Sequence, residues 1–530
     1  MAGHRRLARG RGTGAILFCL VSARLSCAQS LSLEEQRWLD SIAERNVRRQ
    51  LLFLASDAMK GRDTPSVELD IAAAYIAAEF EASGLEGLTR DGYLQRIDLP
   101  GCRVRQEESA LVLSSGGDGE VRLQGPADLV LLAGATENKK EIRRSRVVFC
   151  PDLDSLLDPS LDPRDSLVIA SFRSRAAPAA GETTTNAGPP LRSPEFLSFR
   201  AVQSGIAAVL LWFDQGDEPM RAELERLTGR ACASRLGGSR SARPVFATQH
   251  PRVGEWLAAR AKCSPEELLR NAPAFDCEQE VIVQVPSMEA LTLHSSNVLG
   301  ILRGSDPDLR DECVFVTAHY DHIGVGATVK GDSIYNGADD DASGTVAVIE
   351  LAAAFSRVPV APSRSLVFGC FCAEEKGLRG SKAYVEAPLI PMQQTVANIN
   401  LEMIGRPEDI GENKAWVTGY DYSDVGEILS HAARRMGVEI YRHPKLSDML
   451  FRASDNWSFA EKGVPAHSVS AGSLHADYHQ PGDEVGRLDI ANMTRVIRAL
   501  ALGIQDLSSS EDRPQWNAEN PVGRELGTGR

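Results

Sequence analysis

The chain has 530 residues, more than a single domain usually holds, so we expect two folded units. Hydrophobic residues make up 43% of it and charged residues 25%, which is ordinary for a soluble globular protein and argues against a largely disordered or fibrous chain. The formal net charge is −14, and an acidic surface repels polyanions, so we expect no nucleic-acid partner.

Residues 1–28 have the layout of a secretory signal peptide. Arginines among residues 5–11 precede an apolar stretch from Ala15 to Ala23, and Ser26-Cys27-Ala28 is a small-x-small cleavage site. We therefore expect export to the periplasm or the cell exterior. The apolar stretch is shorter than the roughly 20 residues that span a bilayer, so no stable membrane insertion is expected after cleavage. A lipoprotein attached through Cys27 is less favoured, because Arg24 stands where such a signal has an aliphatic residue.

Helix-like spacing over residues 33–54 and 67–85 comes first, and we expect these helices to open the main domain within residues 29–100. Residues 101–290 differ, because short runs of β-forming residues such as LVLLAG and AAVLLWF alternate there with segments rich in Pro, Gly, Ser and Arg. This change of composition predicts an inserted β-rich second domain.

Strand-like and helix-like segments alternate in residues 291–507. The strand-like runs are SNVLGIL, CVFVTA, SLVFGCFC and VANINLEM, and a helix is expected over about 343–355. Such alternation predicts an α/β fold with a mixed sheet that is mostly parallel and flanked by helices. A last helix over about 488–507 precedes a polar segment, residues 508–530, that we expect to be a flexible tail.

A histidine and an acid follow the run CVFVTA directly, in the sequence His319-Tyr320-Asp321-His322. Open α/β sheets bind ligands beyond the carboxyl ends of their strands. Imidazole is a zinc ligand, and a nearby carboxylate can hold its second ring nitrogen. We therefore expect His319 to bind a metal ion and Asp321 to orient it, although a hydrogen-bonded loop histidine would explain this motif alone.

Acidic residues stand at three further positions of this kind. Asp339-Asp340-Asp341 precede a predicted helix, Glu374-Glu375 follow SLVFGCFC, and Glu402 comes near the end of VANINLEM. Helix capping would account for one acid of the triplet, whereas a carboxylate that bridges two cations would account for the excess. A Glu-Glu pair can divide metal ligation and proton transfer, although on a surface turn such a pair would be unremarkable.

A loop with two histidines, His475 and His479, comes last among these motifs. Its polar composition fits an ordinary surface loop, but the upstream acids still need another neutral donor to complete a coordination shell. Either histidine could supply it.

Together these motifs resemble the co-catalytic zinc metallopeptidase family that includes bacterial leucyl aminopeptidases, aminopeptidase Y and glutamate carboxypeptidase II. The resemblance covers about residues 296–505, with FLASDAMKGRDTPS and the helix after it near the N-terminus. The matching stretches, in the family's order, are NVLGILRGSDPDLRDECVFVTAHYDHIG, NGADDDASGT, CAEEKGLRGS, NINLEMIGR, SDNWSFAEKGVPA and DYHQPGDE. More weakly, FLSFRAVQSGIAAVLLWFDQ in the inserted segment resembles the protease-associated domain of such peptidases.

The resemblance implies two zinc ions per chain and a role for each matching residue. The implied metal ligands are His319 on one ion, Asp340 bridging both, Glu375 and His479 on the other, and Glu402 on the His319 side. Glu374 is implied as the general base and Asp321 as the supporting acid beside His319.

Two positions depart from the family pattern. Glu402 stands where the family usually has Asp, which keeps a carboxylate but lengthens its side chain, so we expect this chain to differ from its relatives at the His319-side ion. Asn456 stands where many relatives have His, and Asp455 before it matches a recurring family acid with a supporting role.

The implied function is that of an exported zinc-dependent aminopeptidase, which hydrolyses N-terminal residues from peptide substrates by means of a water activated by two metal ions. A glutaminyl cyclase-like acyltransferase with a single zinc ion has a similar architecture and is an alternative. A non-catalytic peptidase-like binding protein is the non-enzyme alternative. The presence of both His319 and Glu402 favours two ions over one. No feature of the sequence indicates an oligomeric state.

Overall fold

The computed structural model describes residues 31–528, except residues 91, 115–119, 135–139, 145, 152–162, 173–200, 203–204, 214–234, 237–242, 272, 278 and 280. The expected signal segment, residues 1–28, lies outside the described residues. Within the described part of the chain, no helix is long and apolar enough to cross a membrane.

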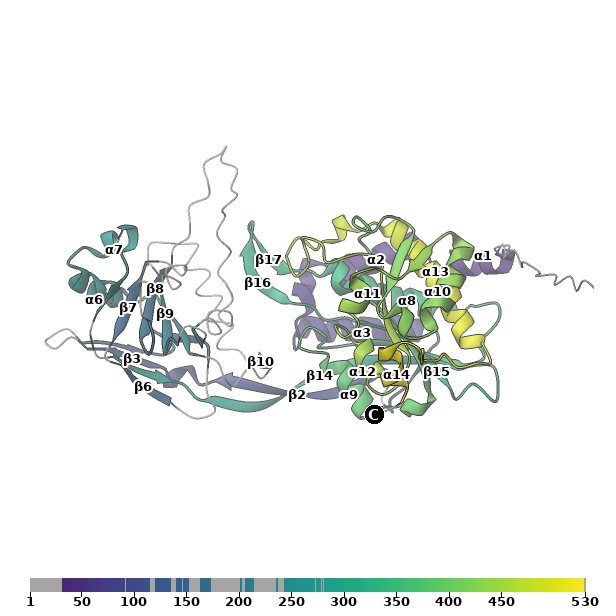
Figure 1. Ribbon diagram of the computed structural model, residues 1–530, viewed down its shortest axis with the longest axis horizontal. Coiled ribbons are helices and arrows are strands. Elements are labelled where there is room, and N and C mark those ends of the chain that lie inside the picture. The colour runs from purple at the N-terminus through teal and green to yellow at the C-terminus, as the bar shows by residue number, and fades with distance from the viewer. Residues whose placement is uncertain are drawn as a thin grey trace, which may run out of the picture.

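A ten-stranded mixed sheet forms the core of the main body (Figure 1). Its strands are β1 (Glu86–Gly87), β2 (Leu94–Val104), β10 (Arg235–Leu236), β14 (Met288–Leu302), β15 (Cys313–His319), β18 (Ser365–Phe371), β19 (Thr395–Leu401), β20 (Lys414–Val417), β21 (Glu439–Tyr441) and β22 (Ala466–Ser470). They lie in the order β10-β2-β14-β18-β15-β19-β22-β20-β21, and β1 pairs with β14 beside this path. The strands from β18 to β22 are parallel, whereas β14 is antiparallel to β18 and β20 to β22. The predicted α/β fold with a mostly parallel mixed sheet is confirmed.

Helices cover both faces of this sheet. They are α1 (Leu33–Asp40), α2 (Glu44–Leu54), α3 (Val67–Ala82), α8 (Gly344–Phe355), α9 (Arg379–Glu386), α10 (Val425–Ala433), α11 (Leu446–Met449), α12 (Asn456–Ala460) and α13 (Ile490–Ser509). Val314 and Val316 of β15 point to one face of the sheet and pack in a core with α2, α3, α8 and α13. Phe315, which lies between them in the strand, points to the other face and packs in a second core with α9 and α12. Because both faces are covered, β15, β18 and β19 are buried along their whole length. A separate hairpin consists of β16 (Gly324–Val329) and β17 (Asp332–Tyr335).

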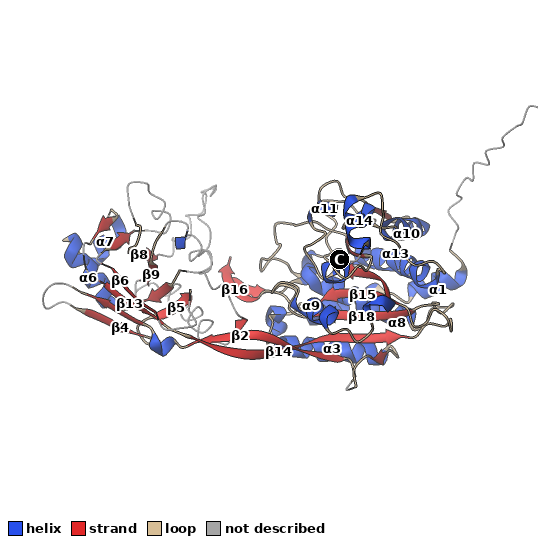
Figure 2. Ribbon diagram, turned by 60° about the horizontal axis from the view of Figure 1, so that its bottom comes forward, coloured by secondary structure: helices blue, strands red, loops and turns tan. Residues whose placement is uncertain are grey.

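β2 and β14 continue beyond the main body into a second one (Figure 2). Their antiparallel pairing runs from Leu94 opposite Val298 to Val104 opposite Met288. The second body has a six-stranded sheet, β12-β7-β8-β9-β11-β5, a four-stranded sheet, β4-β3-β13-β6, and, among its described residues, two α-helices. The bounds are β3 (Ala110–Leu113), β4 (Val121–Gln124), β5 (Val130–Ala133), β6 (Lys140–Arg144), β7 (Val147–Cys150), β8 (Leu167–Phe172), β9 (Ala208–Phe213), β11 (Val245–Thr248), α6 (Pro251–Ala261), α7 (Pro265–Asn271), β12 (Phe275–Asp276) and β13 (Val281–Val285). FLSFRAVQSGIAAVLLWFDQ lies partly outside the described residues, and its apolar run forms β9.

The described part of residues 508–530 does not form the flexible tail that we expected. After α13 the chain folds back along the main body and ends in α14 (Pro521–Gly527). Trp516 forms a β-bridge with Ser423 and donates its indole N–H to the carbonyl oxygen of Gly463, 2.8 Å away. Trp516 and two apolar residues of α14 pack against the second core of the main body. These few apolar contacts order a segment whose overall composition is polar.

Candidate metal centre

The carboxyl ends of four neighbouring parallel strands, together with the turn before α8, bring the predicted site residues together. These residues are His319 at the end of β15, Glu374 and Glu375 after β18, Glu402 after β19, Asp340 before α8 and His479 after β22. Since α/β sheets bind ligands at this edge, the arrangement is that of a functional site.

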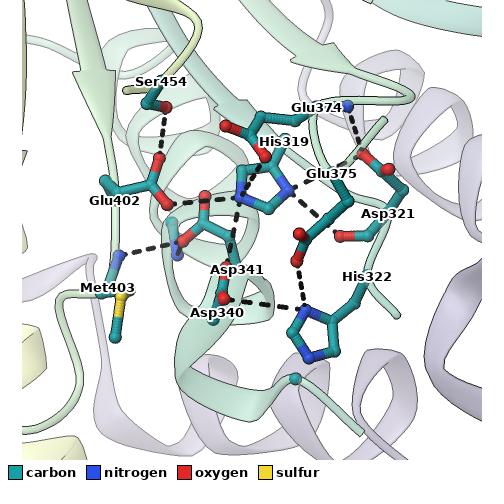
Figure 3. Close-up of polar contacts among 12 residues, drawn as sticks. His319, Asp321, His322, Asp340, Asp341, Glu374, Glu375, Glu402, Met403 and Ser454 are labelled. Carbon is teal, nitrogen blue, oxygen red and sulfur yellow. Dashed lines mark hydrogen bonds and ion pairs between the residues drawn. The ribbon is translucent and has the colours of Figure 1, made fainter. Parts of the chain in front are cut away.

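One donor group consists of an imidazole and two carboxylates. Nε2 of His319 lies 3.3 Å from Oδ1 of Asp340 and 3.3 Å from Oε1 of Glu402 (Figure 3). The three side chains offer ligand atoms within 4.8 Å of one another. The longer side chain of Glu402 therefore reaches the position that a ligand on the His319 side needs.

A second donor group uses the other oxygen of Asp340. Nε2 of His479 lies 3.2 Å from Oδ2 of Asp340 and 3.3 Å from Oε2 of Glu375. Asp340 thus presents Oδ1 to the first group and Oδ2 to the second. A carboxylate that faces two donor groups in this way is placed to bridge two cations.

His322 also joins the second group, although the sequence analysis assigned it no role. Its Nδ1 lies 2.8 Å from Oε1 of Glu375 and 3.8 Å from Oδ2 of Asp340 (Figure 3). His322, Asp340 and Glu375 offer ligand atoms within 4.8 Å of one another. The available signal was the second histidine of the His-x-Asp-His motif.

Only the middle acid of the Asp339-Asp340-Asp341 triplet enters the centre. The backbone is non-helical at Asp340 and Asp341, so the three carboxylates leave the turn in different directions. Asp341 accepts hydrogen bonds from the backbone N–H groups of Gly344 and Met403, 3.0 and 3.1 Å away, and so ties the start of α8 to the end of β19. Oδ2 of Asp339 lies 3.3 Å from Nε2 of His475. His475, the alternative to His479, therefore pairs outside the two donor groups.

Asp321 contacts both His319 and the turn that carries Glu374. Its carboxylate lies 3.7 Å from Nδ1 of His319, whereas its backbone carbonyl oxygen lies at 3.1 Å. The carboxylate accepts hydrogen bonds from the backbone N–H of Glu374, 3.0 Å away, and from the hydroxyl of Thr64, 3.1 Å away. The main chain of Asp321 thus orients His319, and its side chain fixes the turn that carries Glu374.

Polar neighbours also hold Glu402. The hydroxyl of Ser454 donates to Oε2 of Glu402 over 2.5 Å and accepts from Nδ2 of Asn400 over 3.0 Å. Asn456 accepts a hydrogen bond from the hydroxyl of Ser468 and donates one to the carbonyl oxygen of Phe451. Asn456 is fully buried and connects main-body segments beside the centre.

The donor set fits divalent cations. Oδ2 of Asp340, Oε1 of Glu375 and both ring nitrogens of His322 are buried and have no hydrogen-bond partner within the described residues. Buried polar atoms without a partner are rare, because they lose their hydration without compensation. Carboxylate oxygens and imidazole nitrogens are zinc ligands, so an ion held in the second group would satisfy Oδ2 of Asp340, Oε1 of Glu375 and Nδ1 of His322.

Comparison with known protein families finds a match over the part of the chain that holds the candidate metal centre. Residues 297–503 match the sequence model of peptidase family M28. Aminopeptidase YwaD of Bacillus subtilis (strain 168) is 26% identical over 232 residues, which cover 42% of this chain and 46% of that protein. Leupeptin-inactivating enzyme 1 of Streptomyces exfoliatus is 35% identical over 183 residues, which cover 34% of this chain and 36% of that protein. The chain thus spans less than half of the length of these curated relatives, and the resemblance to zinc metallopeptidases is confirmed.

Two solved structures share the fold over most of the chain. BSAP, a zinc aminopeptidase from Bacillus subtilis, is similar with a TM-score of 0.54 and 18% identity, over 89% of this chain and 96% of that one. An aminopeptidase from Aneurinibacillus sp. strain AM-1 has a TM-score of 0.51 and 17% identity, over 90% and 97%. At these identities the likeness shows the fold.

Burial and neighbouring charges shift the pKa values of side chains in the candidate metal centre. Burial opposes protonation of His479, but the adjacent carboxylates of Asp340 and Glu375 outweigh burial and raise its pKa to about 10. Burial alone would raise the pKa of Glu375, yet His322 and His479 hold it at about 2. Glu374 differs, because burial raises its pKa well above the usual range and nearby His319 offsets this only in part. Glu374 therefore binds a proton more readily than an ordinary glutamate.

A cavity lies beside the candidate metal centre. The metal-side carboxylates Asp340, Glu374, Glu375 and Glu402 form one part of its wall. The apolar part of the wall consists of Met403, Trp416, Leu450, Ala453 and Leu474. No Arg or Lys stands among the described residues that line it. A cavity with these walls suits a cationic group next to an apolar one.

Proposed function

We propose that this protein is an exported, zinc-dependent aminopeptidase that hydrolyses N-terminal residues from peptides and holds two zinc ions. The observation that carries the proposal is the position of Asp340, whose two oxygens face two separate donor groups. The curated and structural relatives named aminopeptidases support the same conclusion. Export through residues 1–28, and an inserted domain of residues 101–290 between peptidase segments 29–100 and 291–507, remain part of the proposal.

The ligands divide between the two ions through Asp340. His319 and Glu402 would hold one ion, Glu375 and His479 the other, and Asp340 both. When bound, the two zinc ions would lower the pKa of a water molecule and polarise the scissile carbonyl group.

Glu374 is the proposed general base. Its Oε2 lies 4.0 Å from Nε2 of His319, and its backbone N–H is fixed by Asp321. It also lines the cavity, so it faces the space where substrate and water meet. Because burial raises its pKa, Glu374 accepts a proton from water and passes it to the leaving amine more readily than an ordinary glutamate.

The cavity favours aminopeptidase over carboxypeptidase action. A free N-terminus is a cation, and the carboxylates Glu374 and Glu402 face the cavity. A C-terminal carboxylate would need a cationic side chain as a partner apart from the metal ions, and the described lining residues include no Arg or Lys. The apolar wall around Trp416 and Leu450 indicates that the N-terminal side chain is apolar.

A panel of aminoacyl fluorogenic substrates, each with an N-acetylated counterpart, tests this function with the zinc-loaded full chain. We expect cleavage of free leucyl and phenylalanyl substrates and no cleavage of the acetylated ones. Cleavage confined to N-blocked peptides with acidic C-termini would contradict the aminopeptidase assignment. A stoichiometry fixed at one zinc ion, without peptidase activity, would indicate a glutaminyl cyclase-like enzyme instead.

The variant Glu374→Gln tests the base. It removes the proton acceptor while leaving every proposed ligand in place, so we expect kcat to fall by roughly 10²–10⁴ with zinc stoichiometry unchanged. Elemental analysis of the same preparation provides the control for metal content. Full activity of this variant would exclude Glu374 as the base.

A further inference from the structure

We propose that His322 is a protein ligand of the His479-side ion, which makes this ion the tightly held one and leaves the His319-side ion exchangeable. The inference rests on the two-ion centre of the proposed function. It adds a second imidazole to a site otherwise formed by Asp340, Glu375 and His479.

The position of His322 is that of a ligand. The side chain is fully buried, and its Nδ1 faces Oε1 of Glu375 and Oδ2 of Asp340 (Figure 3). The imidazole rings of His322 and His479 lie with their centroids 5.6 Å apart, nearly perpendicular to each other. Both rings therefore contact the same pair of carboxylates.

Hydrogen bonding does not explain this arrangement. Although Nδ1 of His322 is 2.8 Å from Glu375, neither ring nitrogen has a hydrogen-bond partner among the residues that the structure describes. Oε1 of Glu375 and Oδ2 of Asp340 also have no hydrogen-bond partner among the described residues. Three unpartnered buried donor atoms thus face one another, and a cation between them would satisfy all three.

The surrounding backbone holds the ring in place. The backbone N–H of His322 donates to the carbonyl oxygen of Arg62, 3.2 Å away. The buried guanidinium of Arg62 in turn donates to the carbonyl oxygens of Asn336 and Gly337, over 2.8 and 3.1 Å. A Cβ atom at Gly337 would come within 2.5 Å of the His322 ring, so this glycine leaves the ring its space. The imidazole is therefore positioned before any ion binds.

The two ion sites then differ in the number of protein donors. Two imidazoles and two carboxylates on the His479 side make the four-donor set of a closed zinc site, whereas the His319 side has three donors, with Glu402 and Asp340 beside one imidazole. Three protein donors leave a position open for water or substrate. The His319-side ion is therefore the one that exchanges and that meets the substrate first.

X-ray absorption spectroscopy of the full chain loaded with a single equivalent of zinc tests this inference without any substrate. We expect the signal of two imidazoles around the first zinc ion. A single imidazole in the wild-type protein would overturn the proposal. The outcome is independent of peptidase activity, so an inactive but correctly loaded protein would count against the proposed function alone.

Substitution of His322 gives the second readout. In His322→Ser and in the bulkier His322→Gln, we expect the tighter zinc dissociation constant to rise about 100-fold or more and one imidazole to disappear from the spectrum. His467→Gln is the matched control, since His467 is equally buried but is bonded to Ser423 and Thr418 instead of the metal-side carboxylates. Unchanged zinc affinity in a folded His322 variant would overturn the proposal.

Discussion

Replacement of Glu350 by Gln should stabilise the protein at alkaline pH and have no effect at acidic pH. Glu350 lies on α8, the helix that follows the metal-binding turn, and is buried against α2. Its Oε1 accepts a hydrogen bond from Nε2 of Gln50 over 2.8 Å. Burial raises the pKa of Glu350 from 4.5 to about 7, so the folded protein favours the protonated carboxyl group.

The expected magnitude follows from this pKa. Because the folded-state pKa exceeds the unfolded one, the contribution of Glu350 to stability is most favourable below about pH 4.5 and is lost as the pH rises to about 7. A pKa about 2.5 above its ordinary value corresponds to about 3 kcal/mol, which relaxation around the carboxylate lowers to about 1–3 kcal/mol. Gln is neutral at every pH, and its amide can donate to Oε1 of Gln50, which has no hydrogen-bond partner within the described residues.

Chemical denaturation of both proteins in metal-free form measures this difference. The free energies of unfolding should agree at about pH 4.5 and diverge to about 1–3 kcal/mol in favour of Glu350→Gln at about pH 8. The contributions of the other titrating groups cancel in the difference between the two free energies of unfolding, because both proteins contain these groups. A difference that is independent of pH, or a variant less stable at pH 8, would refute the reasoning.

Two further predictions concern the metal centre and the C-terminal segment. Ser454→Ala removes the hydroxyl that donates to Glu402, so we expect the His319-side zinc ion to bind about 10–100-fold more weakly, with the other ion unaffected. Competition with a chromophoric chelator measures both affinities, and equal losses at the two sites would contradict this assignment. Deletion of residues 510–530 uncovers the core beneath Trp516, so the melting temperature should fall by several degrees in calorimetry, whereas loss of a flexible tail would leave it unchanged.

The ligand positions could be predicted from sequence because each follows a recognisable apolar strand. In a parallel sheet the ends of such strands meet, so His319, Glu375 and Glu402 had to lie near one another once the strands were identified. The choice of Asp340 from three adjacent acids came from the family resemblance, because the directions of the three side chains depend on backbone angles that composition does not encode.

Contacts between distant segments could not be predicted in this way. The position of His322 depends on Arg62, which belongs to an N-terminal motif and holds the turn through backbone carbonyls. The sequence also does not indicate that Asp321 contacts two residues of the centre. Its carbonyl oxygen lies beside the ring of His319, and its carboxylate accepts a hydrogen bond from the backbone N–H of Glu374. The C-terminal segment was predicted to be flexible because its average composition is polar. A single residue, Trp516, instead anchors it through a β-bridge and a contact with the apolar core.

The ladder formed by β2 and β14 bears on how the chain folds. The insertion leaves and re-enters the main sheet on two paired strands, so its two ends lie about one strand spacing, roughly 5 Å, apart. For the main body the insertion is therefore equivalent to the loop of a long hairpin. Each doubling of the length of such a loop raises the entropic cost of closing it by only about 0.6 kcal/mol. The second body has apolar clusters of its own, which can close that loop before the main sheet assembles. Changes of length in the insertion thus leave the register between β14 and β18, and with it the metal centre, undisturbed.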